Sequence, residues 1–421
     1  KDLYVPEEAK GKTMMLEFEG VYMNAQVYVN EQLAAKNMFG YTTFFVKLDD
    51  FLRYGADNEI RVQVRNNNMT NSRWYTGSGI YRDVCLLESG MSYLVPEGIQ
   101  IRCESADRDY AVLKIDTEIK NREHGATAMR LKNIIKDGNG QVVAEEESAA
   151  VLFDQEERTL TQRIAVESPC LWSAETPVLY SCETILYVDG KEADSQTEKF
   201  GVRTLALDAK RGFRVNGESV KLRGACIHHD SGLLGAATFE EAQYRQVRKL
   251  KEAGFNAIRM SHHPMAPAML RACDEIGMYV MDETFDMWNR CKSDLDYGLY
   301  FQEWWEKDVT AMVRKDYNHP SVVLYSVGNE IPEIGTDHGA KTCHDICEKI
   351  RSLDDTRFTL ASINGVFAAG DKVDQIVADV SADLVEKGEL DGNVNDFMTL
   401  MDDHMDEIVV HDAISERLEK A

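Results

Sequence analysis

The sequence predicts a multidomain chain in which two all-β sandwich domains precede an incomplete (β/α)8 barrel. Its length of 421 residues corresponds to about three domains of roughly 150 residues each. About the first 200 residues read as short strands separated by turn residues, which is typical of a sandwich or a barrel. Beyond that point, strand-like apolar runs alternate with helix-length amphipathic segments, and such alternation indicates a parallel sheet.

Composition excludes several classes of protein. Apolar residues make up 44% and charged residues 28% of the chain, as in ordinary soluble globular proteins, so a disordered chain is not expected. The formal net charge of −25 argues against a nucleic acid partner, because an acidic surface repels phosphate. No run of 18 apolar residues occurs, so no membrane partner is predicted. Residues 371–421 hold 15 acidic and four basic residues, and we expect them to form a solvated helical face.

The nine cysteines are an odd number and are scattered without a repeated spacing. This pattern favours free thiols in a reducing compartment over a disulfide framework. The expected location is therefore the cytoplasm. A periplasmic or secreted location stays open, since the sequence starts at Lys1 without an initiator methionine and a signal peptide could have preceded it.

The first domain is predicted over residues 1–89 and the second over residues 90–200. Apolar and polar residues alternate in the first domain at residues 14–18, 27–29, 45–48 and 60–64, the period of a half-buried strand. The second domain carries two hairpin signals, Asp137-Gly138 and Asp189-Gly190, because Asp-Gly accommodates positive φ. About 110 residues of this kind suit an immunoglobulin-like sandwich.

The third domain is predicted over residues 201–421. Its strand candidates are residues 220–227, 255–260, 278–282, 322–327 and 358–363. The best-marked helix begins at Thr238, with Glu241 completing a capping box, and ends at Gly254. Polar residues follow each strand, as they do where a (β/α)8 barrel builds its active site. A doubly wound sheet has the same periodicity, but no glycine-rich phosphate-binding loop follows any of these strands.

The fourth predicted strand ends in Asn329 and Glu330. A carboxyl group at a buried rim can remain protonated and act as a proton donor, which is what cleavage of a glycosidic bond requires. The alternative is a structural role, in which Glu330 caps the following helix or pairs with an arginine.

Histidine pairs follow the first and second strands, His228-His229 and His262-His263. Imidazole is a common zinc ligand, so a zinc site is one alternative. Adjacent residues at a strand end point in opposite directions, so we expect one histidine of each pair to face the substrate and the other to pack. Trp288, near the third strand, is predicted to stack on a sugar ring.

The segment 71–82 of the first domain combines glycine and serine with aromatic residues and arginine. A loop of this composition either contacts substrate, in which case Asn71 is a candidate binding residue, or only packs against the barrel.

Five motifs occur in order: RWYTGSGIYRDV (73–84), FGVR (200–203), LRGACIHHD (222–230), NAIRMSHHP (256–264) and NHPSVVLYSVGNE (318–330). Together they resemble glycoside hydrolase family 2, the family of β-galactosidases, β-glucuronidases and β-mannosidases, over essentially the whole chain. The resemblance implies a retaining β-glycosidase in which residues 1–89 form a jelly roll, residues 90–200 an immunoglobulin-like domain and residues 201–421 the catalytic barrel.

By motif, Glu330 resembles the general acid/base of this family and Asn329 the residue that binds the sugar 2-hydroxyl. Arg259, His262 and His228 resemble pocket residues. The family's nucleophile lies on the seventh barrel strand, whereas this sequence shows only five. We therefore expect an internal piece of a longer polypeptide, inactive by itself. The magnesium-binding members carry a histidine after the third strand that this sequence lacks, so neither a metal nor a cofactor is predicted.

The expected activity is hydrolysis of terminal β-D-glycosides, foremost β-galactosides, by double displacement, with a carbohydrate as the partner. β-Glucuronides and β-mannosides are the alternatives within the family. A non-catalytic carbohydrate-binding scaffold and a metallohydrolase using the paired histidines are alternatives from other classes. A homo-oligomer remains open, because no short motif reports on it.

Overall fold

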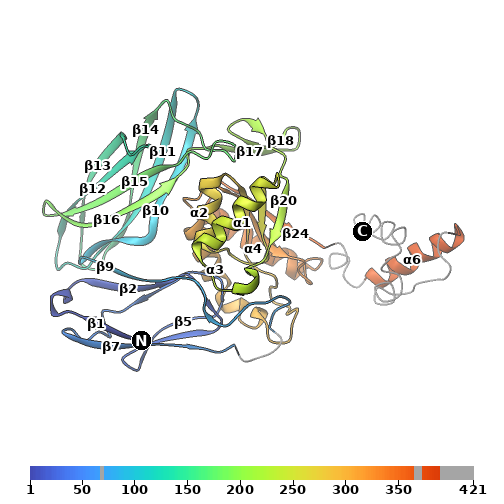
Figure 1. Cartoon of the computed structure of the whole chain (residues 1–421), viewed down its shortest axis with the longest axis horizontal. Helices are drawn as coiled ribbons and strands as arrows, with labels where there is room; N and C mark the ends of the chain where they lie inside the picture. Colours follow the sequence, from blue (N-terminus) through green and yellow to red (C-terminus); the bar gives the residue numbers. More distant parts are fainter. Residues whose placement is uncertain (67–70, 365–371, 389–421) are drawn as a thin grey trace.

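The computed structural model describes residues 1–66, 71–364 and 372–388 (Figure 1). The N-terminal sandwich consists of a four-stranded sheet in the order β1-β7-β4-β5, a three-stranded sheet in the order β6-β2-β9, and the short pair β3-β8. Its apolar side chains gather in one core that includes Phe18, Val27 and Leu48. The strands span Asp2–Val5 (β1), Thr13–Phe18 (β2), Val21–Tyr22 (β3), Ala25–Val29 (β4), Gln32–Asn37 (β5), Phe44–Lys47 (β6), Ala56–Val64 (β7), Gly79–Ile80 (β8) and Val84–Ser89 (β9).

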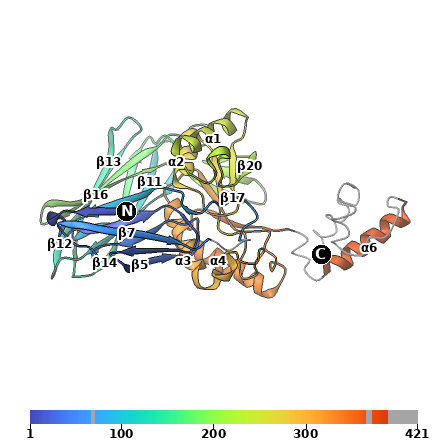
Figure 2. The same cartoon turned by 60° about the horizontal axis from the view of Figure 1, so that its bottom comes forward.

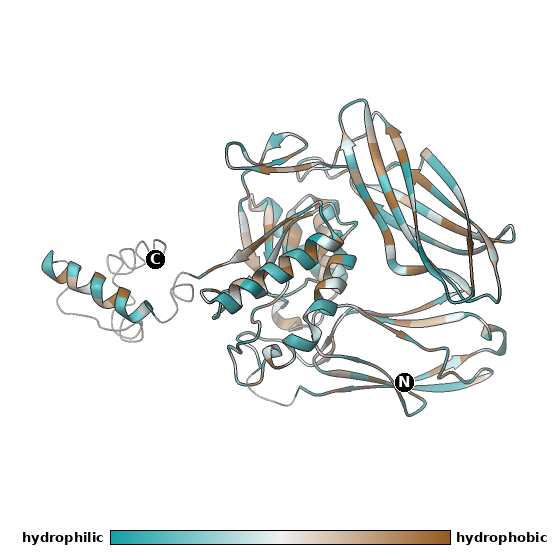
Figure 3. Cartoon of the chain, turned by 180° about the vertical axis from the view of Figure 1, so that it is seen from behind, coloured by the Kyte–Doolittle hydropathy of each residue, from teal (hydrophilic) through white to brown (hydrophobic). Residues whose placement is uncertain are grey.

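The second sandwich has two antiparallel sheets, in the orders β10-β11-β14 and β13-β12-β15-β16. Buried and less buried residues alternate along β11 and β12, and Figure 3 shows hydrophilic and hydrophobic residues alternating along the strands of this sandwich. Both predicted hairpins are confirmed. Asp189 and Gly190 have the expected positive φ, 49° and 77°, whereas in the first hairpin the positive φ, 80°, lies at Gly140 rather than at Asp137-Gly138. The strands span Ser92–Ala106 (β10), Tyr110–Asn121 (β11), Thr127–Lys136 (β12), Val142–Leu152 (β13), Glu157–Glu167 (β14), Tyr180–Val188 (β15) and Lys191–Phe200 (β16).

A small antiparallel sheet of β17, β18 and β19 leads into a parallel sheet whose strands follow chain order from β20 to β24. The predicted alternation of strands and helices is confirmed here, because one helix lies between each consecutive pair of these strands. The strands span Leu205–Asp208 (β17), Gly212–Val215 (β18), Glu218–Ser219 (β19), Gly224–Ile227 (β20), Ala257–Met260 (β21), Tyr279–Glu283 (β22), Val322–Asn329 (β23) and Phe358–Ser362 (β24).

The helices span Glu240–Glu252 (α1), Pro267–Ile276 (α2), Phe301–Asp316 (α3), Asp337–Leu353 (α4) and Val373–Glu386 (α6), with 3-10 turns at Glu7–Ala9, Gly232–Leu234 and Tyr297–Leu299. Helix α1 stops before Gly254, at φ 90°, as predicted. The predicted capping box is wrong: α1 follows Phe239 without a side-chain cap, because the Thr238 hydroxyl lies 2.7 Å from His229 Nε2 instead. No helix of the described residues is long and apolar enough to cross a membrane.

The two sandwiches pack beside each other and both contact the helices that flank the parallel sheet (Figure 2). The Arg314 guanidinium on α3 donates to both carboxylate oxygens of Glu118 on β11, at 3.0 and 2.6 Å. The Thr42 hydroxyl of the N-terminal sandwich donates to Asp308 on α3 at 2.9 Å. Helix α3 therefore fixes both sandwiches against the sheet. All nine cysteines are unpaired thiols, as the sequence predicts.

Candidate active site

Strand β23 places Asn329 and Glu330 at the carboxyl edge of the parallel sheet. All eight residues of the strand are buried, so its backbone is held on both sides. The Asn329 N–H donates to the carbonyl of Phe285 at 2.9 Å, and the Glu330 N–H donates to the carbonyl of Ser362 at 2.9 Å. The end of the strand is thus fixed between the segment that follows β22 and the last residue of β24.

Glu330 has an unusual backbone and an accessible carboxylate. Its φ is 45°, a left-handed conformation that few residues other than glycine adopt and that clusters at functional sites. Its side chain is 39% exposed and one oxygen lies 3.6 Å from an Arg73 nitrogen. The other oxygen accepts from Asn364 at 3.3 Å. Glu330 does not cap α4, whose N-cap is Thr336, although it does pair with an arginine.

The Asn329 amide is oriented through both of its polar atoms. Its Oδ1 accepts from Arg259 Nη2 at 2.8 Å, and its Nδ2 donates to Asp286 Oδ1 at 2.8 Å. An amide can satisfy one arginine and one carboxylate at the same time in only one of its two flipped orientations. Asp286 and Arg259 therefore set which way Asn329 faces.

Glu283, the last residue of β22, holds Arg259 and His262 together. It is fully buried, and its Oε2 accepts from Arg259 Nη2 at 2.7 Å and from the Ser326 hydroxyl at 2.6 Å. His262 Nδ1 lies 2.6 Å from its other oxygen. A buried carboxylate is stable only when charged and polar partners surround it. Glu283 has such partners on β21, in the segment just after β21, and on β23.

The two histidine pairs divide as predicted, with one member of each packed in the core. His229 and His263 are buried, and burial lowers their pKa values well below the usual range. His228 and His262 are less buried, and their rings lie 5.2 Å apart. Burial also lowers the pKa of His228. Among the described residues, no group of three or more His, Cys, Asp or Glu is arranged to hold a metal ion.

Arg73, from the N-terminal sandwich, reaches this edge of the sheet. Its Nη2 and Nε donate to the two oxygens of buried Asp286 at 2.6 and 3.2 Å. Lys292 also donates to Asp286, at 2.8 Å. Asn71 lines a small cavity together with His262 and Asp286, so the predicted loop does lie at the site. Sequence reasoning singled out the loop but missed Arg73, since nothing in the loop shows which of its side chains reaches β23.

Trp288 does not face the site, and the prediction that it stacks on a sugar is wrong. Its indole is completely buried, and its Nε1–H donates to the carbonyl of Val327 at 3.0 Å. The chain after β22 turns this side chain beneath Gly328. A Cβ atom at position 328 would lie only 3.0 Å from the indole ring, so the glycine leaves room for Trp288. Trp288 therefore supports the end of β23 from below.

The chain has two β-sandwiches followed by a parallel β/α sheet. A carboxylate, an amide, an arginine and histidines lie at the strand ends of that sheet. This combination defines the class of multidomain glycoside hydrolases. A model of glycosyl hydrolases family 2 matches residues 95–203, and the model of the TIM barrel domain of that family matches residues 207–408. The chain belongs to glycosyl hydrolase family 2.

Relatives with printed activities include the beta-galactosidase BoGH2A of Bacteroides ovatus, which is 39% identical over 342 residues, covering 81% of this chain and 40% of that protein. A putative beta-glucuronidase of Formosa agariphila is 37% identical, covering 76% of this chain and 30% of that protein. The crystal structure of a family 2 member from Bacteroides cellulosilyticus matches with a TM-score of 0.85 and 39% identity, over 88% of this chain and 48% of that one. The chain thus spans less than half the length of these relatives.

Proposed function

We propose that this chain carries the acid/base half of the active site of a retaining β-glycosidase. The observation that supports this most is Glu330 itself: a partly exposed carboxylate with left-handed backbone at the end of a buried strand, beside an amide whose orientation is fixed. Glu330 would protonate the leaving oxygen and then, as a base, deprotonate the attacking water. Asn329 would bind the hydroxyl next to the anomeric carbon.

The nucleophile would come from outside the described residues. Retention requires a second carboxylate roughly 5 to 5.5 Å from the first. Two carboxylates that contact the site residues, Glu283 and Asp286, are buried. Glu283 already accepts from Arg259 and the Ser326 hydroxyl, and Asp286 from Arg73 and Lys292, so neither is free to attack. We propose further that the described residues alone do not hydrolyse a glycoside, since they supply the acid/base but no free nucleophile.

For the substrate we propose a terminal β-galactoside, with a β-glucuronide as the second candidate. The first rests on the 39% identity to a protein named beta-galactosidase and the second on the 37% identity to one named as a putative beta-glucuronidase. The test uses an extended enzyme that includes the rest of the barrel. Its hydrolysis rates with 4-nitrophenyl β-galactoside and with 4-nitrophenyl β-glucuronide distinguish the two substrates.

We also propose the domain division at residues 1–89, 90–200 and 201 onward, as a jelly roll, an immunoglobulin-like sandwich and the barrel. Separate apolar cores in the first and second of these ranges support it. Residues 389–421 of the third range lie outside the described residues.

The test compares Glu330→Gln with Glu241→Gln, a matched change on helix α1, in the extended enzyme. Removing a general acid slows hydrolysis by about 10²- to 10⁴-fold. We expect that loss for Glu330→Gln with disaccharides, a smaller loss with 4-nitrophenyl glycosides, whose leaving group needs no proton, and no loss for Glu241→Gln. Sugar binding without hydrolysis in the extended wild type would instead support the scaffold alternative.

A further inference from the structure

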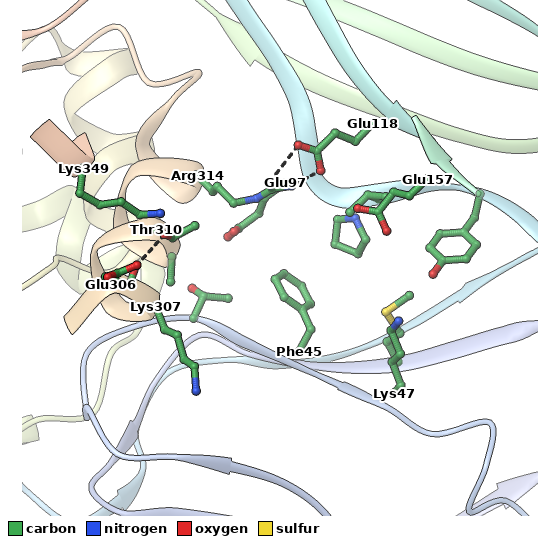
Figure 4. Close-up of a pocket in the computed structure, with 16 residues that line it drawn as sticks. Phe45, Lys47, Glu97, Glu118, Glu157, Glu306, Lys307, Thr310, Arg314 and Lys349 are labelled. Atoms are coloured by element: carbon green, nitrogen blue, oxygen red, sulfur yellow. Dashed lines mark hydrogen bonds and ion pairs between the residues drawn. The ribbon is translucent and has the colours of Figure 1, made fainter. Parts of the chain in front are cut away.

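An open cleft lies between the two sandwiches and helices α3 and α4 (Figure 4). Its volume is about 530 Å³, within the range of small-molecule sites. It is lined from β2, β6, β10, β11, β14, α3 and α4, and none of the active-site residues described above lies on it. The cleft is therefore a second, separate place where a ligand could be held.

A bulge in β10 turns Glu97 toward this cleft. The pairing of β10 with β11 shifts between Leu94 and Ile99, and Glu97 has the left-handed φ of 54°. A Cβ on the adjacent Gly98 would lie 2.7 Å from the carbonyl oxygen of Val95, so this bulge requires glycine. Bulges and left-handed residues recur where a side chain is directed at a binding site. Partial burial raises the pKa of Glu97 to about 8.

Thr43 supplies an unsatisfied polar atom in the same wall. Its side chain is 5% exposed and lines the cleft, and within the described part of the chain its hydroxyl has no hydrogen-bond partner. A buried hydroxyl without a partner destabilises the folded chain. This oxygen has almost no accessible surface, so a ligand hydroxyl in the cleft would bond it only after the Thr43 side chain rotates about χ1.

The remaining lining is aromatic and balanced in charge. Phe45 points into the cleft, opposite Glu97 and Arg314 (Figure 4), and Tyr93 also lines it. The lining contains four glutamates and four basic side chains, of which Arg314 and Glu118 pair with each other. Because Glu97 is mostly protonated at neutral pH, at most one positive charge remains in excess, and the lining has no strong preference for an anion or a cation. An aromatic ring with donors and acceptors on both sides suits a pyranose, which has an apolar face and hydroxyl groups around its edge.

We propose that this cleft is a non-catalytic binding site for a neutral sugar, with Phe45 stacking on the ring and Thr43 and Glu97 bonding its hydroxyls. The site is independent of Glu330, so it can be present whether or not the proposed hydrolysis is confirmed.

The test is calorimetric titration of the 421-residue chain with lactose and with cellobiose, in an Asn329→Ala background that weakens binding at the catalytic edge. We expect saturable binding that becomes about tenfold weaker in Phe45→Ala, which removes the stacking ring, and a few-fold weaker in Thr43→Val. Phe153→Ala, at an exposed phenylalanine of the second sandwich, is the matched control and should bind like its parent.

Thermal unfolding followed by circular dichroism shows that each variant is folded. Three results would overturn the proposal: no saturable binding of either disaccharide, equal affinity in Phe45→Ala and Phe153→Ala, or preferential binding of galacturonate or glucosamine, the charged probes, over both neutral sugars.

Discussion

Asp286 links the N-terminal sandwich to the catalytic residues through one buried carboxylate. It accepts from Arg73, Lys292 and Asn329, and Arg73 extends from it to within 3.6 Å of Glu330. Charge-assisted bonds of this kind are shorter and stronger than neutral ones and fix geometry. The orientation of the proposed acid/base, which follows a strand of the parallel sheet, thus depends on a residue of the N-terminal sandwich.

Replacing Arg73 by alanine is expected to lower kcat/KM of the extended enzyme about 10- to 100-fold, the effect of losing one hydrogen bond to a charged group. Arg73→Lys should recover little of this, because an ammonium cannot contact both oxygens of Asp286 and Glu330 in the same arrangement. Steady-state kinetics measures both. Rates within twofold of wild type in Arg73→Ala would show that the contact has no part in catalysis.

At the level of residues, sequence reasoning located the strand-end positions and missed the contacts between segments. Glu330, Asn329 and His262 follow apolar runs, so their clustering could be predicted from topology alone. The Arg73 contact joins positions 213 residues apart, and no local pattern encodes it. Trp288 was misplaced because the side to which a residue turns after a strand is decided by packing, here beneath Gly328.

Among the elements, β10 contains the bulge at residues 95–98 that places Glu97 in the wall of the cleft between the sandwiches and α3. Gly98→Ala is expected to lower the free energy of unfolding by about 1 to 3 kcal/mol, because the added methyl group would collide with the Val95 carbonyl and force the bulge to shift. Gly138→Ala is the matched control, since its Cβ would meet only the Leu179 carbonyl at 3.5 Å. Urea denaturation of the two variants checks this, and equal stability would mean that the bulge adapts freely.

The elements themselves were well predicted where periodicity was strong. All five parallel strands lie within a few residues of their predicted positions, but β20 starts at Gly224 rather than at 220. The Val220 N–H donates to Phe213 on β18, so the start of that apolar run belongs to a different sheet. A single sequence cannot show which of two partners a strand-like segment will take.

At the scale of the whole molecule, carboxyl groups lie where the sandwiches and the helices meet. Burial raises the pKa of Glu17 and the pKa of Asp308 to about 7 each. It also raises the pKa of Glu97, to about 8. Glu17 and Glu198 face Glu97 and raise its pKa further, whereas Lys315 and Arg314 oppose them. Near neutral pH these carboxyl groups are therefore partly protonated in the folded chain, whereas they would be ionised in the unfolded chain.

This difference predicts that stability falls as the pH rises. The folded-state pKa of Glu97 lies above its unfolded value of 4.5, so between these values the native state binds more protons and each increase in pH favours unfolding. Below about pH 6.5 the buried histidines oppose this slope, because their lowered pKa values mean that the unfolded chain binds more protons at these sites. The melting temperature of the 421-residue chain should therefore fall most clearly between about pH 6.5 and pH 8. Glu97→Gln should flatten the upper part of that slope. Glu104→Gln is the control and should leave the slope unchanged. Glu104 pairs with Arg163, which lowers its pKa, so it does not titrate between pH 5 and pH 8. Identical slopes in the three proteins would show that Glu97 ionises freely in the folded state.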